Sequence, residues 1–157
     1  MMLVNENDEL RRDFGIRSRD AKRILKCRQQ LCIPMPALGE VFCKIRDKCK
    51  DNSNEVLLTL NKLMDDGYFQ TRYISNPYDT FELSKRLSNR RRDSRDLISA
   101  MDALILATAI VDPDCTEFYT SDTKLVSDSN VSEIVADYRE NNDYDRMAVI
   151  PIDKIIA

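Results

Sequence analysis

Apolar residues recur along the chain at two alternating spacings. Apolar positions three and four residues apart predict helices over 18–27, 36–49, 55–66, 97–111 and 131–139, and Asn76-Pro77-Tyr78-Asp79 predicts the start of one more. Short apolar runs predict strands over 30–34, 69–74, 117–120 and 147–152. Because helices and strands alternate, the pattern predicts an α/β protein in which helices flank a parallel sheet.

Capping residues and apolar faces locate several helix ends. Ser18 and Asn54 are candidate caps, Pro36 suits a first helical turn, and Gly67 suits a helix stop. The predicted inward faces of the helices at 36–49 and 55–66 are formed by Leu38, Val41, Phe42, Ile45, Leu57, Leu60, Leu63 and Met64.

Length and composition predict one globular domain over residues 1–157. Hydrophobic residues make up 43% of the chain and charged residues 32%, with three glycines, which favours a helix-rich fold over disorder. No linker or repeat divides the chain, although the polar residues 1–20 are expected to be mobile or atypical. The N-terminus lacks an apolar signal core and no stretch resembles a membrane span, so a cytoplasmic location without membrane contact is expected.

The chain contains no histidine, which restricts its chemistry. Ser-His-Asp and Cys-His machinery and the commonest zinc sites are excluded, so catalysis would use carboxylates, Lys, Tyr, Cys or metal-bound water. The five cysteines are odd in number, contain no C-x-x-C pair and lie in apolar patterns, and they are expected to be reduced core residues: Cys27, Cys32, Cys43, Cys49 and Cys115. A zinc site formed by the first four is disfavoured because their gaps match no common ligand spacing.

Asp102 is the one charged residue within Leu97–Val111, a stretch predicted to be a helix buried on every side. Removing water from a carboxylate is costly unless a counter-charge, hydrogen bonds or a metal replaces it. Two interpretations remain open for Asp102 alone: a metal ligand, or a carboxylate at the helix start bonded to backbone N–H groups or an Arg.

Two further acids occupy positions that line the crevice of a parallel α/β sheet. Asp122 follows the predicted strand ending at Thr120, and Glu40 lies in the first turns of the helix after the 30–34 strand. Three carboxylates that met there would repel one another unless a divalent cation joined them. Oxygen ligands suit Mg²⁺ or Mn²⁺.

Three segments resemble the internal motifs of PIN-domain ribonucleases, in that family's order: Ala37-Leu38-Gly39-Glu40-Val41, the Ser99–Ala109 stretch, and Tyr119-Thr120-Ser121-Asp122. The resemblance implies a three-layer α/β/α sandwich around a mainly parallel sheet of about four to five strands. It implies that Glu40, Asp102 and Asp122 are catalytic metal ligands, with Thr120 and Ser121 supporting Asp122 through their hydroxyls.

The N-terminal position departs from that family's pattern. Where the family has an aspartate, this chain aligns Asn5, with Glu6 in the neighbouring hydroxyl position. Asn5 offers a neutral carbonyl ligand without charge, and Glu6 or Asp8 would substitute in a different register. The alternatives of a start upstream or a weakened site remain open.

The resemblance implies hydrolysis of RNA assisted by Mg²⁺ or Mn²⁺, and by analogy a toxin-type nuclease with an antitoxin-type protein partner and a homodimer. A net charge of −3 is unusual for a nucleic-acid binder, so local basic residues would have to bind the phosphates. Arg90, Arg91 and Arg92 are the RNA-binding candidates, with an ordinary solvated helix face as the alternative.

Two other functional classes compete with the nuclease. A catalytically weakened or inactive module of the same fold, acting in RNA or protein binding, would explain Asn5. A phosphatase or phosphotransferase with an Asp nucleophile is disfavoured because no Asp-x-Asp pair follows an N-terminal strand.

Overall fold

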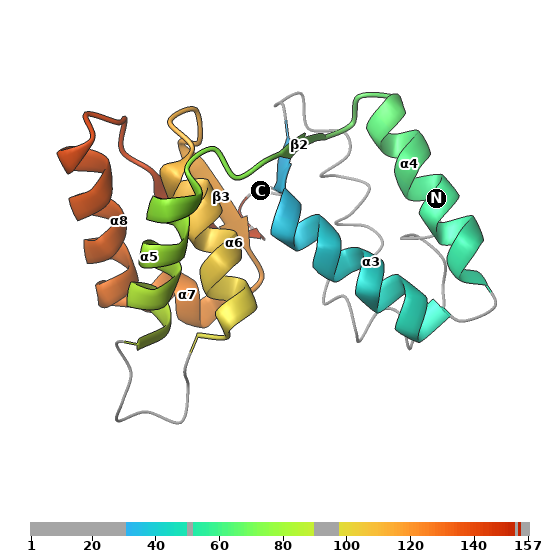
Figure 1. Ribbon diagram of the computed structural model, residues 1–157, viewed down its shortest axis with the longest axis horizontal. Helices are drawn as coiled ribbons and strands as arrows, with labels where there is room; N and C mark the ends of the chain where they lie inside the picture. The colour runs from blue at the N-terminus through green and yellow to red at the C-terminus, as the bar shows by residue number, and fades with distance from the viewer. Residues whose placement is uncertain (1–30, 50–51, 90–97, 153, 155–157) are drawn as a thin grey trace. The chain divides into compact units, whose positions relative to one another are not determined.

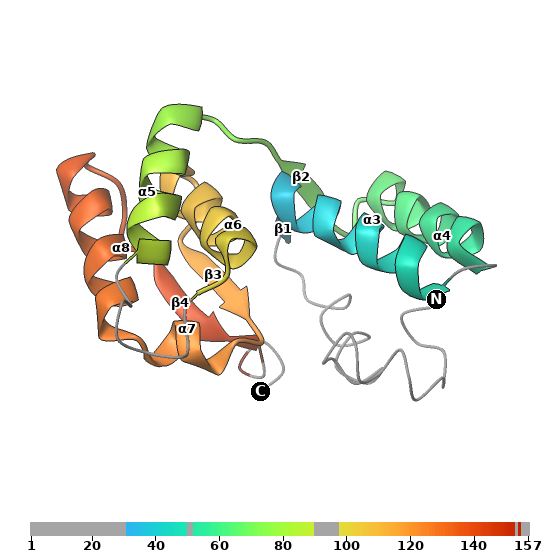
Figure 2. The ribbon, with the colours of Figure 1, turned by 60° about the horizontal axis from the view of Figure 1, so that its bottom comes forward.

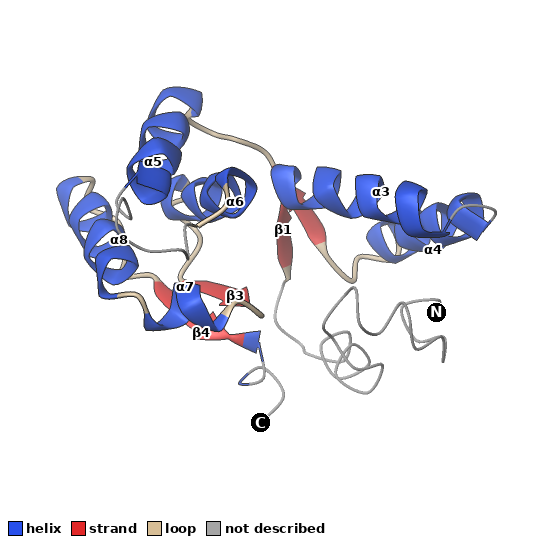
Figure 3. Cartoon of the chain, turned by 90° about the horizontal axis from the view of Figure 1, so that it is seen from below, coloured by secondary structure: helices blue, strands red, loops and turns tan. Residues whose placement is uncertain are grey.

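Helices predominate over short strands in the computed structural model, which describes residues 31–49, 52–89, 98–152 and 154 (Figures 1 and 3). The described residues group into two units, unit 1 with 31–33, 37–72 and 154, and unit 2 with 34–36 and 73–152, leaving aside the gaps. The mixed α/β class is confirmed, whereas the strands of the described part form two separate two-stranded sheets. The single domain expected over 1–157 stays a prediction.

Unit 1 contains α4 (Ser53–Asp65), β2 (Gln70–Arg72) and all but residues 34–36 of β1 (Cys32–Pro34) and α3 (Met35–Cys49). Strands β1 and β2 pair, with the Gln70 N–H donating to the Leu31 carbonyl at 2.9 Å. The α3 face is confirmed at Leu38 and Ile45, which are buried. On α4 the buried residues are Val56 and Leu60, whereas Leu57, Leu63 and Met64 are only half-buried, so the predicted inward face holds at Leu60 and missed Val56.

The two ends of α4 test the capping predictions. Asn54 is not the cap, because the helix begins at Ser53 after Asn52, whose side chain makes no capping hydrogen bond. The predicted stop at Gly67 is confirmed: it has φ +74°, and its N–H donates to the Met64 carbonyl at 3.0 Å. The following N–H, from Tyr68, donates to the Leu63 carbonyl at 3.0 Å, which completes a Schellman motif.

Unit 2 contains α5 (Pro77–Asn89), α6 (Ala100–Val111), β3 (Glu117–Thr120), α7 (Thr123–Ser127), α8 (Ser129–Asn141) and β4 (Ala148–Pro151). Strands β3 and β4 are parallel, with Glu117 opposite Ala148 and Thr120 opposite Pro151. The strand predicted at 117–120 matches β3 in full, and α8 begins two residues before its predicted start because Asp128 caps it. The single helical turn α7 was not predicted, since five residues are too few to show a helical period.

The start of α5 follows the predicted Asn76-Pro77-Tyr78-Asp79 pattern. The Asp79 N–H donates to the Asn76 side-chain oxygen at 3.2 Å, and the Thr80 N–H donates to the Asn76 carbonyl at 3.0 Å. The Asn76 amide donates in return to the Asp79 carboxylate at 2.8 Å. Asn76 therefore caps the helix from both its side chain and its main chain.

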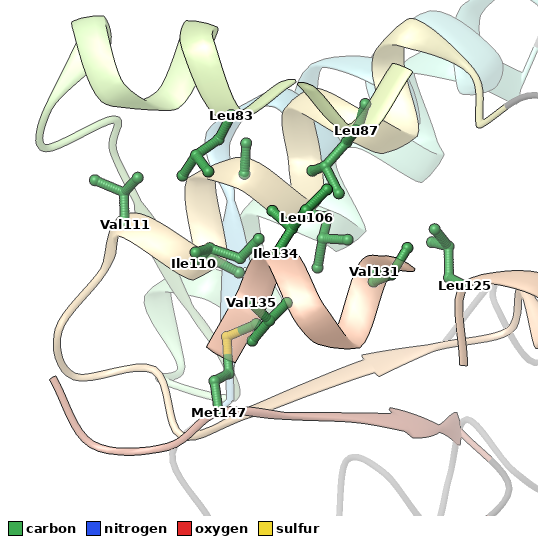
Figure 4. Packing of buried hydrophobic residues seen from close by; sticks show 13 residues of the cluster. Leu83, Leu87, Leu106, Ile110, Val111, Leu125, Val131, Ile134, Val135 and Met147 are labelled. Atoms are coloured by element: carbon green, nitrogen blue, oxygen red, sulfur yellow. The ribbon is translucent and has the colours of Figure 1, made fainter. Parts of the chain in front are cut away.

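The core of unit 2 lies where α5, α6 and α8 meet. In Figure 4 the side chains of Leu83 and Leu87 on α5 and of Ile134 on α8 approach Leu106 and Ile110 of α6. Each of these five is at most 3% exposed, and burying one aliphatic side chain of this size stabilises a fold by about 1.5–3 kcal/mol. The parallel ladder β3–β4 contributes Phe118 and Val149 to the rim of the same cluster.

Arg139 of α8 is buried in this unit, with only 1% of its surface exposed. Its guanidinium donates to the main-chain carbonyls of Asp145 at 2.6 Å, Asp112 at 2.7 Å, and Ile110 and Pro113 at 3.3 Å. Three of those carbonyls belong to the C-terminal end of α6 and the turn after it, where carbonyls lack helical partners. The sequence pattern placed Arg139 at a helix end and gave no sign of its burial.

The cysteines depart from the predicted core positions. Cys32 and Cys43 are exposed, and Cys49 and Cys115 are half-buried. The apolar neighbours of Cys32 and Cys43 in sequence therefore point to other sides of their strand and helix. Cys27 lies outside the described residues. None of the described helices combines the length and the apolar character needed to cross a lipid bilayer.

Candidate functional site

Asp102 occupies the first turn of α6 and is tied to the helix cap. Its backbone N–H donates to the Ser99 Oγ at 3.1 Å, and the Ser99 hydroxyl donates to the Asp102 Oδ2 at 2.6 Å. Burial on α6 begins only at Ala103, whereas Met101 is exposed and Asp102 is half-buried. The prediction that the stretch is buried on every side is therefore wrong for its first turn, and Leu104 and Ile105 are also only half-buried.

This geometry answers part of the question raised by the sequence. The capping hydroxyl replaces part of the hydration of the Asp102 carboxylate, and the helix N-terminus is a favourable place for a negative charge. Asp102 thus lies at a helix start, as the second interpretation expects. Its carboxylate accepts from the Ser99 hydroxyl, whereas that interpretation expected an Arg or backbone N–H groups. The partial exposure also leaves the carboxylate accessible to a ligand in solution.

Asp122 lies in the turn between β3 and α7. Its N–H donates to the Thr120 Oγ1 at 3.0 Å, and its carbonyl accepts from the Val126 N–H at 3.4 Å. The Thr120 hydroxyl thereby fixes the backbone that carries Asp122, which is half-buried, while Ser121 is exposed. Thr120 orders this turn through the main chain of Asp122.

The two aspartates of unit 2 lie toward the same end of that unit. Residues 112–116 form the connection between α6 and β3, which run in opposite directions, so the helix begins at the end where the strand finishes (Figures 1 and 2). Asp102 is the third residue of α6, and Asp122 is the second residue after β3. The reversal of the chain between them therefore brings residues twenty positions apart in sequence to one end of unit 2.

Glu40 belongs to unit 1, on α3. Its carboxylate forms an ion pair with Lys44 one turn later, at 2.8 Å, with 33% of the Glu40 side chain and 50% of the Lys44 side chain exposed. An exposed pair of this spacing contributes about 0.3–0.5 kcal/mol, so it constrains Glu40 only weakly. Gly39, before it, is exposed and has open space around its Cα.

The donor chemistry of unit 2 fits a hard divalent cation in type. Mg²⁺ commonly takes one or two protein carboxylates and completes its shell with water and substrate phosphates. Within the described ranges, no group of three or more His, Cys, Asp or Glu side chains is placed to hold a metal ion. The set of three acids and the bound cation expected from the sequence stay predictions.

Several predicted site residues lie outside the described part of the chain. They are Asn5, Glu6 and Asp8 at the N-terminus and Arg90, Arg91 and Arg92 after α5. Of the basic residues before this run, Lys85 is exposed and pairs with Glu82 at 3.7 Å, and Arg86 is exposed.

Two features were missed by reasoning from the sequence. The Tyr138 hydroxyl donates to the Asp79 Oδ2 at 2.8 Å and joins α8 to the start of α5 across 59 residues. Burial of this hydroxyl, followed by its hydrogen bond to Asp79, raises the pKa of Tyr138 above its ordinary value. The second feature is the exposure of Tyr78 and Phe81 on α5, for which the helical spacing of Thr80, Leu83 and Leu87 was an available signal.

Comparison with known proteins yields no relative. No family model matches the chain, and no curated protein or solved structure matches it at a significant level. The resemblance to PIN-domain ribonucleases therefore rests on the three sequence segments.

Proposed function

We propose that this chain is a metal-dependent ribonuclease that hydrolyses phosphodiester bonds with Asp102 and Asp122 at the centre of its site. The proposal includes a PIN-like three-layer α/β/α sandwich with a central sheet of about four to five strands, to which β3 and β4 would contribute. It also includes Mg²⁺ or Mn²⁺ as the cation and Glu40 as a third acid.

One observation carries the proposal: Asp102 and Asp122 share one end of unit 2, each on a turn ordered by a neighbouring hydroxyl. Ser99 bonds the Asp102 side chain directly, and Thr120 bonds the Asp122 backbone. Such supports hold carboxylates in fixed positions, as a site for a charged substrate requires. Both motifs that carry the resemblance most specifically are contained in this one unit.

The residues would act by position and charge. A bound divalent cation would supply neutralisation of phosphate charge and Lewis acidity. Asp102 would bind it from the helix start and Asp122 from the strand end. Ser99 would keep the Asp102 carboxylate oriented, because its hydroxyl bonds Oδ2 and leaves Oδ1 for the cation.

RNA as the substrate follows from the resemblance, as do a homodimer and an antitoxin-type protein partner. These parts of the proposal depend on the resemblance to the family and on no contact within the chain. A cytoplasmic location is likewise part of the proposal.

The decisive experiment compares Asp102→Asn with the native protein in Mn²⁺-dependent cleavage of an end-labelled single-stranded RNA. Asn keeps an oxygen that can accept from Ser99 but removes the charge, so folding should be preserved. We expect the cleavage rate to fall at least about 100-fold, because even the partners of metal ligands typically matter 10–100-fold. Asp122→Asn should behave alike.

Asp137→Asn is the matched control. Asp137 is an exposed acid on α8 of the same unit, so its amide variant removes one charge without touching the site. Equal activity of Asp102→Asn and Asp137→Asn, or absence of any Mn²⁺-dependent cleavage by the native protein, would refute the nuclease proposal.

A non-catalytic binding module of the same fold is the second candidate. It is favoured by Asn5 in the place of the family's first acid and by the lack of a three-acid group in the described ranges. The two candidates differ in their response to millimolar Mn²⁺, because a cation bound to the folded state raises the melting temperature. A binding module predicts no such rise in native protein, whereas the nuclease predicts a rise that Asp102→Asn abolishes.

A further inference from the structure

The outer face of α5 carries two aromatic rings in a charged setting. Tyr78 is 77% exposed and Phe81 is 57% exposed, although the helix buries Thr80, Leu83 and Leu87 on its opposite side. Residues three and four apart share one side of a helix, with Cβ atoms about 5–6 Å apart. Tyr78, Phe81 and Lys85 therefore form a continuous strip, which we name the α5 strip.

We propose that the α5 strip binds single-stranded RNA, with bases stacking on Tyr78 and Phe81 and phosphates contacting Lys85 and Arg86. The proposal rests on the proposed ribonuclease function for the identity of the nucleic acid. It adds where the strand lies on unit 2 and which side chains hold it.

The residue types on the exposed face of α5 favour RNA over a protein as the ligand of the α5 strip. The exposed α5 residues comprise two aromatic rings, three charged residues, one proline and one polar residue, with no Val, Leu, Ile or Met among them: Pro77, Tyr78, Phe81, Glu82, Lys85, Arg86 and Asn89. Aromatic rings and Arg also occur in protein–protein interfaces, but the cores of such interfaces are depleted of Lys and Glu, and here Glu82 and Lys85 adjoin Phe81. Rings beside cations suit unpaired bases joined by phosphates.

The charges along the α5 strip also favour RNA as its ligand. Lys85 and Arg86 follow Phe81 by about one turn, so a strand stacked on the rings passes cations within that turn. Glu82 is the opposing charge, and it is held near Lys85 at 3.7 Å with both side chains exposed. An RNA phosphate would compete with Glu82 for Lys85. Removing the charge of Glu82 should therefore strengthen RNA binding, whereas removing the cations should weaken it.

The experiment measures binding of a fluorescein-labelled single-stranded RNA to the full chain by anisotropy in EDTA, where cleavage is suppressed. Tyr78→Leu combined with Phe81→Leu keeps apolar bulk but removes both rings. We expect Kd to rise at least about tenfold, since stacking on one aromatic ring typically contributes this much. Tyr78→Phe should leave Kd unchanged because the ring remains.

The charged positions give two further expected results. Lys85→Ala with Arg86→Ala should reduce the slope of log Kd against log salt by about 0.7 for each phosphate that is no longer neutralised. Glu82→Gln should lower Kd by about threefold, the size typical of one exposed charge pair. Tyr68→Ala, an aromatic residue of 45% exposure that follows α4, is the control and should leave Kd unchanged.

The outcomes separate this proposal from the ribonuclease proposal. An unchanged Kd in the double leucine variant, or no RNA binding by the native chain, overturns the α5 strip. A double leucine variant with unaltered RNA binding but weakened self-association in sedimentation assigns the strip to a second copy and also overturns it. Native protein that binds RNA through the strip but never cleaves it supports the strip and refutes the nuclease.

Discussion

The buried guanidinium of Arg139 gives the sharpest stability prediction. Replacing it by Met keeps an unbranched aliphatic chain of similar reach and removes every donor. The carbonyls of Asp112 and Asp145, which accept at 2.7 and 2.6 Å, then lose their short hydrogen bonds to α8. The carbonyls of Ile110 and Pro113, at 3.3 Å, lose weaker ones.

The magnitude follows from the two short hydrogen bonds. A hydrogen bond to a charged group contributes about 1.5–3 kcal/mol, so the two short ones together contribute about 3–6 kcal/mol. Burying Met instead of a guanidinium recovers part of this, because the charged group no longer has to be desolvated. We expect Arg139→Met to lower the free energy of unfolding by about 3 kcal/mol, a large share of the 5–15 kcal/mol typical of a domain.

The assay is urea unfolding followed by far-ultraviolet circular dichroism, with near-ultraviolet dichroism as a local probe. The Tyr138 and Tyr144 rings lie 6.2 Å apart, and the Arg139 Cζ lies 5.1 Å from the Tyr144 ring centroid, so the tyrosine signal reports on this corner. Arg146→Met is the control. Arg146 is exposed on the same unit, and its replacement should change stability by less than about 0.5 kcal/mol.

The result is also expected to be insensitive to salt, because a group with 1% exposure is poorly screened. A decrease below about 1 kcal/mol for Arg139→Met would refute the reasoning, since the two short hydrogen bonds would then contribute less than a bond to a buried charged group does. So would equal decreases for Arg139→Met and Arg146→Met.

Three more predictions concern caps, glycines and pH. Tyr138→Phe removes the bond to Asp79 and should lower the free energy of unfolding by about 1.5–3 kcal/mol. Because the unfolded tyrosine ionises near pH 10 while the pKa of folded Tyr138 is higher, its contribution is full below about pH 10 and is lost as pH rises through the folded pKa. Absorbance titration should therefore show a late-ionising tyrosine that is absent in Tyr138→Phe. Asp128→Ala removes the cap bond to the Asn130 N–H, 2.9 Å, and should lower the melting midpoint by an amount equivalent to about 1 kcal/mol; an unchanged midpoint would contradict the cap. Gly39→Ala, in open space within α3, should raise the free energy of unfolding by about 0.5–1 kcal/mol. Gly67→Ala, at φ +74°, should lower it by about 1 kcal/mol. Melting temperatures that both rise or both fall would contradict the assigned conformations.

Local signals in the sequence determined most of the described elements. The turn chemistry of Asn76-Pro77 placed the start of α5, and Gly67 placed the end of α4. Both predictions hold because capping depends on residues within one turn of the chain. Asn54 failed as a cap because Ser53 already has helical geometry, which leaves the polar residue two positions earlier at the boundary.

Long-range packing decided what the sequence pattern could not. The apolar sequence of α6 does not indicate which of its residues are buried. In the structure Met101 is exposed, whereas Leu106 is buried. The contacts of Arg139 with the end of α6 join residues 26–29 positions apart, which no spacing rule anticipates. Such burial depends on which unpaired carbonyls the tertiary fold presents.

For the candidate site too, the sequence determined some features and the tertiary structure decided others. The sequence determined the donor types, acids and hydroxyls without histidine, because chemistry is a property of each residue. The bond from Ser99 to the Asp102 carboxylate is local, three residues along the chain, whereas only the tertiary structure decided that the chain reversal after α6 carries Asp122 to the same end of unit 2. The physical reason is that a hydrogen bond or a shared ligand requires atoms within a few ångströms, and the distance between residues far apart in sequence is set by packing.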